Sequence, residues 1–352
     1  MTIRVLVVDD SAFMRVMLTK MLQEDASIQV IGTARNGKDA VARTHQFSPD
    51  VITMDIEMPE LNGISALKQI MAEHPTPVIM LSTLTTKEAD ATMDALQNGA
   101  FDFLAKPGNQ REITELGPQL ITRVKLAAKA GVHRLGTAQV VTPSAVHRTY
   151  SNNTTVPNTR VYQIVAIGTS TGGPRALETV LRELPNSISF PIVIVQHMPP
   201  KFTKSLADRL NTVCAIRVVE AKHGQRVDNG TAYIAPGGFH MTVVEKEGQY
   251  QIALNEGEKC NEHRPSVDVL FESLALLKRV TRHLVIMTGM GSDGAKGMSQ
   301  AKQSGASTIV ESEETCVVFG MPKSAISMNC VDYVVPVHQI ASKIMQVADL
   351  QR

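Results

Sequence analysis

The first third of the chain alternates short apolar runs with longer segments of helical periodicity. The apolar runs occupy residues 4–8, 51–54, 78–81 and 101–105, and the periodic segments occupy 12–23 and 63–73. Short apolar runs bounded by turn residues are typical of buried strands, whereas the periodic segments are typical of amphipathic helices. This alternation predicts a doubly wound α/β domain with a parallel sheet.

The same alternation returns after residue 160. Apolar runs at 164–167, 192–195 and 284–288 are each followed by turn residues, which predicts a second α/β sheet. Between them, residues 232–234, 240–244 and 250–254 have the shorter spacing of antiparallel hairpins, with a turn at Glu247 and Gly248. The pattern therefore predicts a second doubly wound sheet that is mostly parallel and carries an antiparallel hairpin.

The segment between the two patterned regions has a different composition. Residues 131–160 lose periodicity and are rich in Thr, Ser, Asn and Pro, and residues 123–160 carry Lys and Arg but no Asp or Glu. This composition predicts a flexible linker, with a phosphate-binding basic patch as the alternative. We therefore expect one domain at 1–124, a flexible linker at 125–160 and a second domain at 161–352.

The composition of the whole chain fits two globular domains. Its 352 residues exceed the usual size of one core, and a net charge of +1 gives no reason to expect nucleic acid as a partner. No apolar stretch approaches the roughly 18 residues of a membrane span, and the run at 4–8 is too short for a signal peptide. The 4 cysteines are scattered, which predicts reduced thiols in a cytoplasmic protein rather than disulfides or a zinc site.

Charged and hydroxyl side chains follow the predicted strands of the first domain. They are Asp9 and Asp10 after the run at 4–8, Asp55 after the run at 51–54, Ser82 after the run at 78–81 and Lys106 after the run at 101–105. The carboxyl ends of parallel strands meet at one edge of a sheet, so these groups should share a cleft. Carboxylates in one cleft repel one another unless a cation neutralises them, and oxygen ligands suit Mg²⁺. Asp55 could then attack a phosphoryl donor. The alternative is that these residues are solvated carboxylates at ordinary loop ends. That alternative explains any one of them better than it explains all of them together.

The segment Met54-Asp55-Ile56-Glu57-Met58-Pro59, together with Asp9-Asp10 and Lys106-Pro107, resembles the response-regulator receiver family over residues 1–124. The resemblance implies a five-stranded, flavodoxin-like parallel sheet and phosphorylation of Asp55 by a histidine kinase. It also implies a set of site residues, namely Mg²⁺ ligands Asp10, Asp55 and the Glu57 backbone carbonyl, assisted by Asp9, and switch residues Ser82, Phe103 and Lys106. Many receivers have threonine and tyrosine where this chain has Ser82 and Phe103.

A serine lies in the first turn of the second domain. The apolar run at 164–167 leads into Gly168-Thr169-Ser170-Thr171-Gly172, a Gly-x-Ser-x-Gly sequence, and then into a predicted helix. A serine on such a strand-to-helix elbow projects its hydroxyl above the sheet, and the helix amides can stabilise an oxyanion. Ser170 is therefore a candidate nucleophile. A glycine-rich phosphate loop is the alternative, but the segment lacks the lysine of a P-loop.

Two further strand ends supply partners for this serine. His197 follows the run at 192–195 and Asp293 follows the run at 284–288, so both should lie at the same sheet edge as Ser170. The histidine is a candidate base, and the aspartate would fix its tautomer and stabilise the imidazolium. The chain order Ser, His, Asp differs from that of α/β-hydrolases.

The segments around these residues resemble the methylesterase domain of bacterial chemotaxis. They are residues 168–174, 196–199, 235–241, 263–268 and 288–294. With the receiver ahead of them, the resemblance is to the CheB family and covers almost the whole chain apart from the linker. It implies a chemotaxis response regulator that hydrolyses glutamate γ-methyl esters on chemoreceptors and deamidates receptor glutamines through Ser170, His197 and Asp293.

The same resemblance implies further features of the site. The main-chain amide of Met290, with Thr171 close by, is the expected oxyanion donor. Mg²⁺ is expected in the receiver and no cofactor for the esterase. The expected partners are chemoreceptors as substrate and the chemotaxis histidine kinase as phosphodonor, without nucleic acid or direct membrane insertion, and we expect a monomer.

Other interpretations of the second domain remain open. A receiver-linked adaptor would keep the fold and bind chemoreceptors or kinase without catalysis, and methanol release would distinguish it from an esterase. A DNA-binding regulator would need a helix-turn-helix and a basic effector domain, which the sequence lacks. His240 and His263 could suggest a metal pair, but zinc ligands normally have closer local spacing, which favours a structural or substrate-contacting role.

Overall fold

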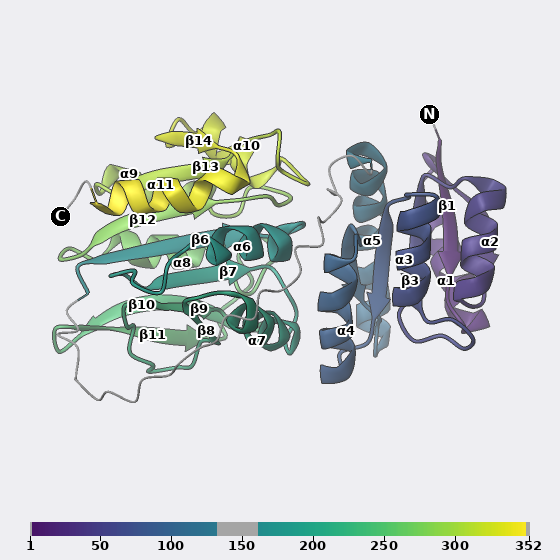
Figure 1. The fold of residues 1–352 in the computed structure, drawn as a ribbon, viewed down its shortest axis with the longest axis horizontal. Coiled ribbons are helices and arrows are strands. Elements are labelled where there is room, and N and C mark those ends of the chain that lie inside the picture. The colour runs from purple at the N-terminus through teal and green to yellow at the C-terminus, as the bar shows by residue number, and fades with distance from the viewer. Residues whose placement is uncertain (1, 132–160, 350–352) are drawn as a thin grey trace. The chain divides into compact units, whose positions relative to one another are not determined.

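The computed structural model describes residues 2–131 and 161–349, and these ranges form two compact units (Figure 1). Most of the expected linker, residues 132–160, lies outside the described residues. Its first part is not linker, because helix α5 spans Gln110–Ala130 and continues past the boundary expected at residue 124. Val124 and Ala127 are fully buried on this helix, so its apolar face still packs against the core there.

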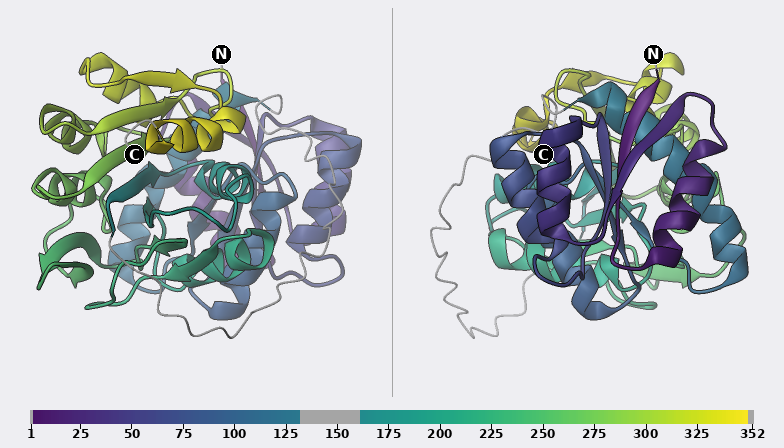
Figure 2. Two further views of the ribbon diagram at one scale, coloured as in Figure 1. Left: turned by 60° about the vertical axis from the view of Figure 1, so that its left-hand side comes forward. Right: turned by 90° about the vertical axis from the view of Figure 1, so that its right-hand side faces the viewer.

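The first unit contains a five-stranded sheet in the order β2-β1-β3-β4-β5, with every neighbouring pair parallel, as expected. Its strands are β1 (Ile3–Val8), β2 (Ile28–Ala34), β3 (Val51–Asp55), β4 (Val78–Ser82) and β5 (Asp102–Ala105). The helices before α5 are α1 (Ala12–Gln23), α2 (Gly37–Phe47), α3 (Gly63–Glu73) and α4 (Thr86–Gln97). The helices lie on both sides of the sheet (Figure 2, right), which is the doubly wound arrangement.

Short polar side chains fix where the helices of the first unit begin. Each helix has an N-cap residue whose side chain accepts a hydrogen bond from the backbone N–H three residues later. The caps are Ser11, Asn36, Asn62, Thr85 and Asn109. Such caps satisfy amides that have no partner within the helix. The caps therefore fix the point at which the chain enters each helix after a strand, which helps to position the side chains at the strand ends.

The second unit contains a seven-stranded sheet in the order β14-β13-β12-β6-β7-β9-β8, and every neighbouring pair is parallel. Its strands are β6 (Gln163–Thr169), β7 (Ile192–Gln196), β8 (Arg217–Glu220), β9 (Thr231–Ile234), β12 (Thr281–Ile286), β13 (Ser307–Glu311) and β14 (Tyr333–Val335). Its helices are α6 (Gly173–Arg182), α7 (Phe202–Val213), α8 (Val267–Ala275), α9 (Ala295–Gln303), α10 (Met321–Ser327) and α11 (Val337–Asp349). Within residues 2–131 and 161–349, no helix has the length and apolar character that a membrane span requires.

The expected antiparallel hairpin is present as a separate two-stranded sheet of β10 (His240–Lys246) and β11 (Gln249–Asn255). The predicted turn at Glu247 and Gly248 is confirmed, and both residues have positive φ, as a tight hairpin turn requires. Residues 232–234, which we expected to belong to the hairpins, lie instead in β9 of the parallel sheet. This strand is fully buried between β7 and β8, which explains its continuous apolar character.

The order of strands defines where a site can form in the second unit. Strand β6 lies between β7 and β12, and the chain passes from β6 to β7 first and reaches β12 only later. The connection after β6 runs to β7 on one side and the connection after β12 runs to β13 on the other, so the two connections diverge and open a crevice at the carboxyl ends of β6 and β12. The three candidate residues of this unit follow these three strands.

A buried histidine, His283, links three neighbouring strands in the middle of the same sheet. His283 on β12 donates from Nε2 to Gln163 Oε1 on β6 over 3.0 Å, and its Nδ1 accepts from the Ser307 hydroxyl on β13 over 2.6 Å. Gln163 in turn donates to the carbonyl of Ala348 on α11 over 3.1 Å. Both ring nitrogens are thus satisfied by the neutral ring, and burial lowers the pKa of His283 to about 4.

We expect this histidine to make the second unit sensitive to mild acid. The pKa of His283 in the folded state lies below that of a free histidine, about 6.5, so the unfolded chain takes up the proton first as the pH falls. The stabilisation is complete above pH 6.5 and is lost toward pH 4, by up to about 3 kcal/mol. Urea unfolding followed by circular dichroism at pH 5 and 7 should show a smaller pH dependence for His283→Gln than for the wild type. Equal dependence in both proteins would contradict this assignment.

Candidate active site

Two aspartates and a lysine meet at the carboxyl end of the first sheet. Asp55 ends β3, Asp9 follows β1 and Lys106 follows β5. The Lys106 Nζ atom lies 2.9 Å from Asp9 Oδ2 and 2.8 Å from Asp55 Oδ1. The exposed Asp10 contributes a carboxylate oxygen within 4.8 Å of oxygens of Asp9 and Asp55. The sequence-predicted residues are therefore brought together, as the convergence of strand ends requires.

The donor set of this cleft fits a magnesium ion. Its carboxylates offer only oxygen atoms, which are the ligands that hard divalent cations prefer. Burial raises the pKa of Asp55 to about 6, although the hydrogen bond from Lys106 acts in the opposite direction. A nearby divalent cation would favour the ionised carboxylate. Glu57, whose carbonyl is the third expected ligand, lies just after β3, and its side chain pairs with Lys87 over 2.6 Å.

The two expected switch residues, Ser82 and Phe103, are both buried. The Ser82 hydroxyl donates to Glu88 Oε2 over 3.3 Å and accepts from Thr92 Oγ1 over 3.0 Å. Glu88 also accepts from the backbone N–H and the hydroxyl of Thr83. The Ser82 hydroxyl is therefore bound to helix α4. Sequence reasoning did not identify Glu88 or Thr92, whose only signal is their place in the first turns of the helix after β4.

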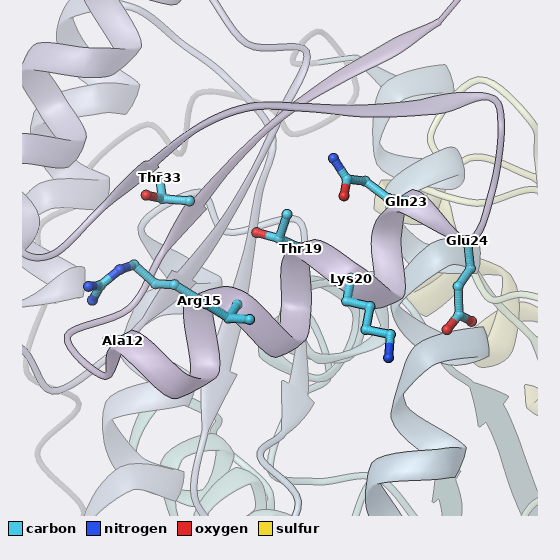
Figure 3. A pocket seen from close by; sticks show the side chains of 8 residues that line it. Ala12, Arg15, Thr19, Lys20, Gln23, Glu24 and Thr33 are labelled. Atoms are coloured by element: carbon cyan, nitrogen blue, oxygen red, sulfur yellow. The ribbon is translucent and has the colours of Figure 1, made fainter.

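A surface cavity of about 710 Å³ lies in the first unit, lined by α1 and by Thr33 of β2 (Figure 3). Arg15 contributes to its wall and donates from Nη1 to the carbonyl oxygens of Asp9 over 2.7 Å and Asp10 over 2.9 Å. This arginine thereby supports the loop that carries the acidic residues. Its lining includes none of the charged side chains of the acidic cleft.

In the second unit, Ser170 follows β6 and precedes α6, as predicted. Its N–H donates to the Thr288 carbonyl over 3.0 Å, and its own carbonyl accepts from the N–H of Gly173 over 2.8 Å. Glycines are needed to close this elbow, because Gly172 has a φ of 81° and a Cβ on Gly173 would lie 2.0 Å from Gln196 Oε1. The turn leaves the Ser170 side chain partly exposed at the sheet edge.

His197 lies beside Ser170 on the neighbouring strand. Thr169 of β6 pairs with Gln196 of β7, and the two candidate residues are the next ones along. Neighbouring strands are about 4.8 Å apart, so the backbones of Ser170 and His197 run side by side. The Gln196 side chain ties them by donating from Nε2 to the carbonyls of Ser170 over 3.0 Å and His197 over 3.1 Å. The only sequence signal for Gln196 is a polar residue at the end of an apolar strand.

His197 is paired with the third candidate, Asp293. Its Nε2–H donates to Asp293 Oδ2 over 2.7 Å, and the two side chains are 5% and 1% exposed. Because a carboxylate only accepts, this bond puts the proton of the neutral ring on Nε2 and the lone pair on Nδ1. The buried Nδ1 makes no hydrogen bond within the described residues, so the expected bond from the Ser170 hydroxyl is not formed here. Such bonds often tighten only when substrate binds.

Four further hydrogen bonds hold the Asp293 carboxylate. The donors are Asn261 Nδ2 at 2.9 Å, the Ser266 hydroxyl at 2.8 Å, the Val267 N–H at 2.7 Å and the Asp268 N–H at 3.1 Å. Burial alone would raise the pKa of Asp293, but the hydrogen bonds and the charge of His197 hold that pKa well below its usual range. The carboxylate is thus ionised at neutral pH and can stabilise a protonated histidine.

A second buried acid, Asp268, lies close to Asp293, and both acids accept hydrogen bonds from the same side-chain amide. Burial raises the pKa of Asp268, and the charge of Asp293 acts in the same direction. Asn261 Nδ2 lies between the two acids and donates to Asp268 Oδ2 over 2.8 Å as well as to Asp293. Sequence reasoning gave no role to Asn261, Ser266 or Asp268, because none of them ends a predicted strand.

The loop after β12 passes close to the serine. A Cβ on Gly289 would lie 2.8 Å from the Cβ of Ser170, so a glycine is needed at this approach. Met290 follows it and is partly exposed, whereas Thr171 is buried and its carbonyl accepts from Thr288 Oγ1 over 2.9 Å. Both expected oxyanion residues are therefore near Ser170, and their role as donors stays a prediction.

Both ring nitrogens of His240 are occupied by hydrogen bonds, which does not favour a metal pair with His263. His240 donates from Nε2 to the Glu258 carbonyl over 2.8 Å and accepts from the Ser266 N–H at Nδ1 over 3.3 Å. These two bonds are consistent with a structural role, which is one of the two roles expected for this histidine. The ring of His263 instead stacks on the ring of His197, with centroids 3.7 Å apart and planes inclined by 14°.

Comparisons with known proteins match both units. A family model described as CheB methylesterase matches residues 165–344, and one described as response regulator receiver domain matches residues 5–116. A Geobacillus kaustophilus protein named protein-glutamate methylesterase/protein-glutamine glutaminase is 47% identical over 348 residues, covering 98% of each chain. A Bacillus subtilis protein of the same name is 44% identical over 356 residues, covering 99% of each. The crystal structure of the Thermotoga maritima CheB methylesterase catalytic domain is 45% identical with a TM-score of 0.51, covering 53% of this chain and 98% of that one.

We expect Asp293→Asn to lower the free energy of unfolding of the second unit by about 1–3 kcal/mol, because the new amide N–H₂ would face N–H and O–H donors and leave some of them unpaired. Asp268→Asn is the matched control, since it removes a carboxyl whose pKa is already raised and should cost less. Urea unfolding of both variants at pH 7 measures the difference. Equal losses would show that the Asp293 carboxylate has no special role.

Proposed function

The chain belongs to the CheB family of protein-glutamate methylesterases/protein-glutamine glutaminases, and we propose that it acts as a serine hydrolase through Ser170, His197 and Asp293. Its function is phosphorylation-activated hydrolysis of glutamate methyl esters on chemoreceptors, giving glutamate and methanol, together with deamidation of receptor glutamines. The buried pair of His197 and Asp293, next to Ser170 at the switch point of the sheet, is the observation that carries this proposal.

In the first half of the reaction, the Ser170 hydroxyl attacks the side-chain carbonyl carbon of the substrate. His197 Nδ1, which carries the lone pair of the neutral ring, takes the hydroxyl proton as the new C–O bond forms. The ionised Asp293 stabilises the resulting imidazolium through the bond to Nε2–H. The imidazolium then returns its proton to the departing methoxide or amide nitrogen, so methanol or ammonia leaves and the acyl-enzyme remains.

In the second half, water takes the place of the serine hydroxyl. His197 removes a proton from the water, which attacks the acyl carbon, and the Ser170 oxygen leaves with that proton. The product is a glutamate side chain in either case, which explains how one site performs both demethylation and deamidation. The negative charge on the carbonyl oxygen in both steps would be stabilised by the Met290 amide and by Thr171.

The first unit supplies control. We propose that Asp55 accepts a phosphoryl group from the chemotaxis histidine kinase, with Mg²⁺ held by Asp10, Asp55 and the Glu57 carbonyl and assisted by Asp9. When bound, the metal would neutralise charge on the phosphoryl oxygens. The Lys106 ammonium, which contacts both Asp9 and Asp55, would balance charge on the acyl phosphate and reorganise when Asp55 is modified.

Ser170→Ala should lower methanol release from methylated chemoreceptor membranes by at least about 10³-fold, since no other group replaces the nucleophile. The assay uses full-length protein with acetyl phosphate and Mg²⁺. Ser342→Ala, at an exposed position on α11, is the matched control and should retain wild-type activity. Substantial release by Ser170→Ala would exclude the proposed nucleophile, and no release by the wild type from several receptors would favour the adaptor alternative.

Acetyl phosphate with Mg²⁺ should raise the rate of methanol release by the wild type severalfold, because phosphorylation of Asp55 shifts the protein toward its active state. The response should vanish in Asp55→Ala and after removal of the metal with EDTA. Asp90→Ala, which removes an exposed carboxylate of α4, should respond like the wild type. A response that persists in Asp55→Ala would mean that another group is the phosphoacceptor.

A further inference from the structure

The ring of His197 has a second contact besides its bond to Asp293. The ring of His263 lies parallel to it, with centroids 3.7 Å apart and an angle of 14° between the planes. The hydrogen bond at Nε2 fixes one atom of the His197 ring but does not by itself fix the plane of the ring about the axis through Cβ and Nε2. Nδ1 has no hydrogen-bond partner within the described residues that would stop rotation about this axis. A flat group against the face of the ring would stop it.

We propose that His263 is a positioning residue for the reaction, whose ring holds the plane of His197 so that Nδ1 stays available to Ser170. This inference rests on the proposed function, in which His197 Nδ1 is the base. His263 acts through the face of its ring and neither receives the serine proton nor binds the substrate. It adds to the three residues of the hydrolase a fourth that acts only through the base.

A tight turn brings His263 to this place. The N–H of His263 donates to the Cys260 carbonyl over 2.9 Å, and the N–H of Cys260 donates to the His263 carbonyl over 3.1 Å. The two residues between them, Asn261 and Glu262, have φ values of 50° and 65°. Positive φ at both central positions defines a type I′ turn, which is unusual without glycine and is kept only where other contacts require it.

The side chain of Asn261, at the tip of the turn, makes the contacts that stabilise this conformation. Asn261 Nδ2 donates to Asp293 Oδ1 over 2.9 Å and to Asp268 Oδ2 over 2.8 Å. One turn therefore contacts both members of the His197–Asp293 pair, with Asn261 on the acid and His263 on the base. Because the carboxylate anchors the turn, the stacked ring keeps a fixed position relative to the bond between His197 and Asp293. This double contact indicates a positioning role for the turn rather than incidental packing.

The test compares His263→Phe with His263→Leu in the full-length protein, using methanol release from methylated receptor membranes with acetyl phosphate and Mg²⁺. Phenylalanine keeps a flat ring but has no nitrogen, whereas leucine has similar bulk and no ring. We expect His263→Leu to lower kcat by about 10- to 100-fold with KM changed less than about twofold, as for a misplaced reacting group. His263→Phe should recover most of the wild-type kcat.

Three outcomes would overturn the proposal. If His263→Phe is as slow as His263→Leu, the nitrogen atoms of His263 are needed and it acts by another route. A raised KM with unchanged kcat would make it a substrate contact, and wild-type kinetics in both variants would leave it without a role. If the wild type itself releases no methanol, the proposed function has failed rather than this inference.

A second measurement does not depend on turnover. The proton between His197 Nε2 and Asp293 should give a downfield signal in proton NMR, identified by its loss in Asp293→Asn. We expect the signal to persist in His263→Phe and to broaden by exchange with water in His263→Leu, where the ring is free to turn. An unchanged signal in His263→Leu would contradict the positioning role even if that variant were slow.

Discussion

The buried carboxylate of Asp293 is the constraint on which the arrangement of the second unit depends. A charge with 1% of its side chain exposed is stable only where hydrogen bonds replace its lost hydration. Those bonds come from the start of α8, from the turn at residues 260–263 and from His197 after β7. All three segments must therefore converge on the loop after β12. Since β6 is the strand between β7 and β12, Ser170 at its end lies at the point of convergence.

The same constraint favours catalysis over a domain that only binds receptors. A buried acid–histidine pair generally contributes less to stability than apolar packing of the same volume, so stability alone does not account for it. Here the pair leaves a basic nitrogen, His197 Nδ1, buried without a hydrogen bond among the described residues. Such a nitrogen beside a serine elbow is suited to proton transfer, and an unpaired polar atom elsewhere would only be a cost.

Much of this organisation could be predicted because the ends of parallel strands are readable in the sequence and meet at one edge. The supporting contacts could not be predicted. Asn261 reaches Asp293 only through two successive residues in left-handed conformation, and the Ser82 hydroxyl binds α4, neither of which leaves a pattern in the sequence.

The boundary at residue 124 was misplaced because the basic composition beyond it obscured Val124 and Ala127, whose burial continues the apolar face of α5. Strand β9 was grouped with the hairpins because only a short loop separates it from β10.

A single acyl-enzyme on Ser170, shared by ester and amide substrates, is the central claim, and trapping with hydroxylamine tests it most directly. Hydroxylamine competes with water for the acyl carbon and yields a glutamyl hydroxamate while freeing the serine. Receptors carrying either the methyl ester or glutamine at the same position would be digested, and hydroxamate and glutamate measured by mass spectrometry. We predict the same ratio of the two products from both substrates, because each has lost its leaving group before the products diverge. A ratio that depends on the leaving group would contradict a common acyl-enzyme.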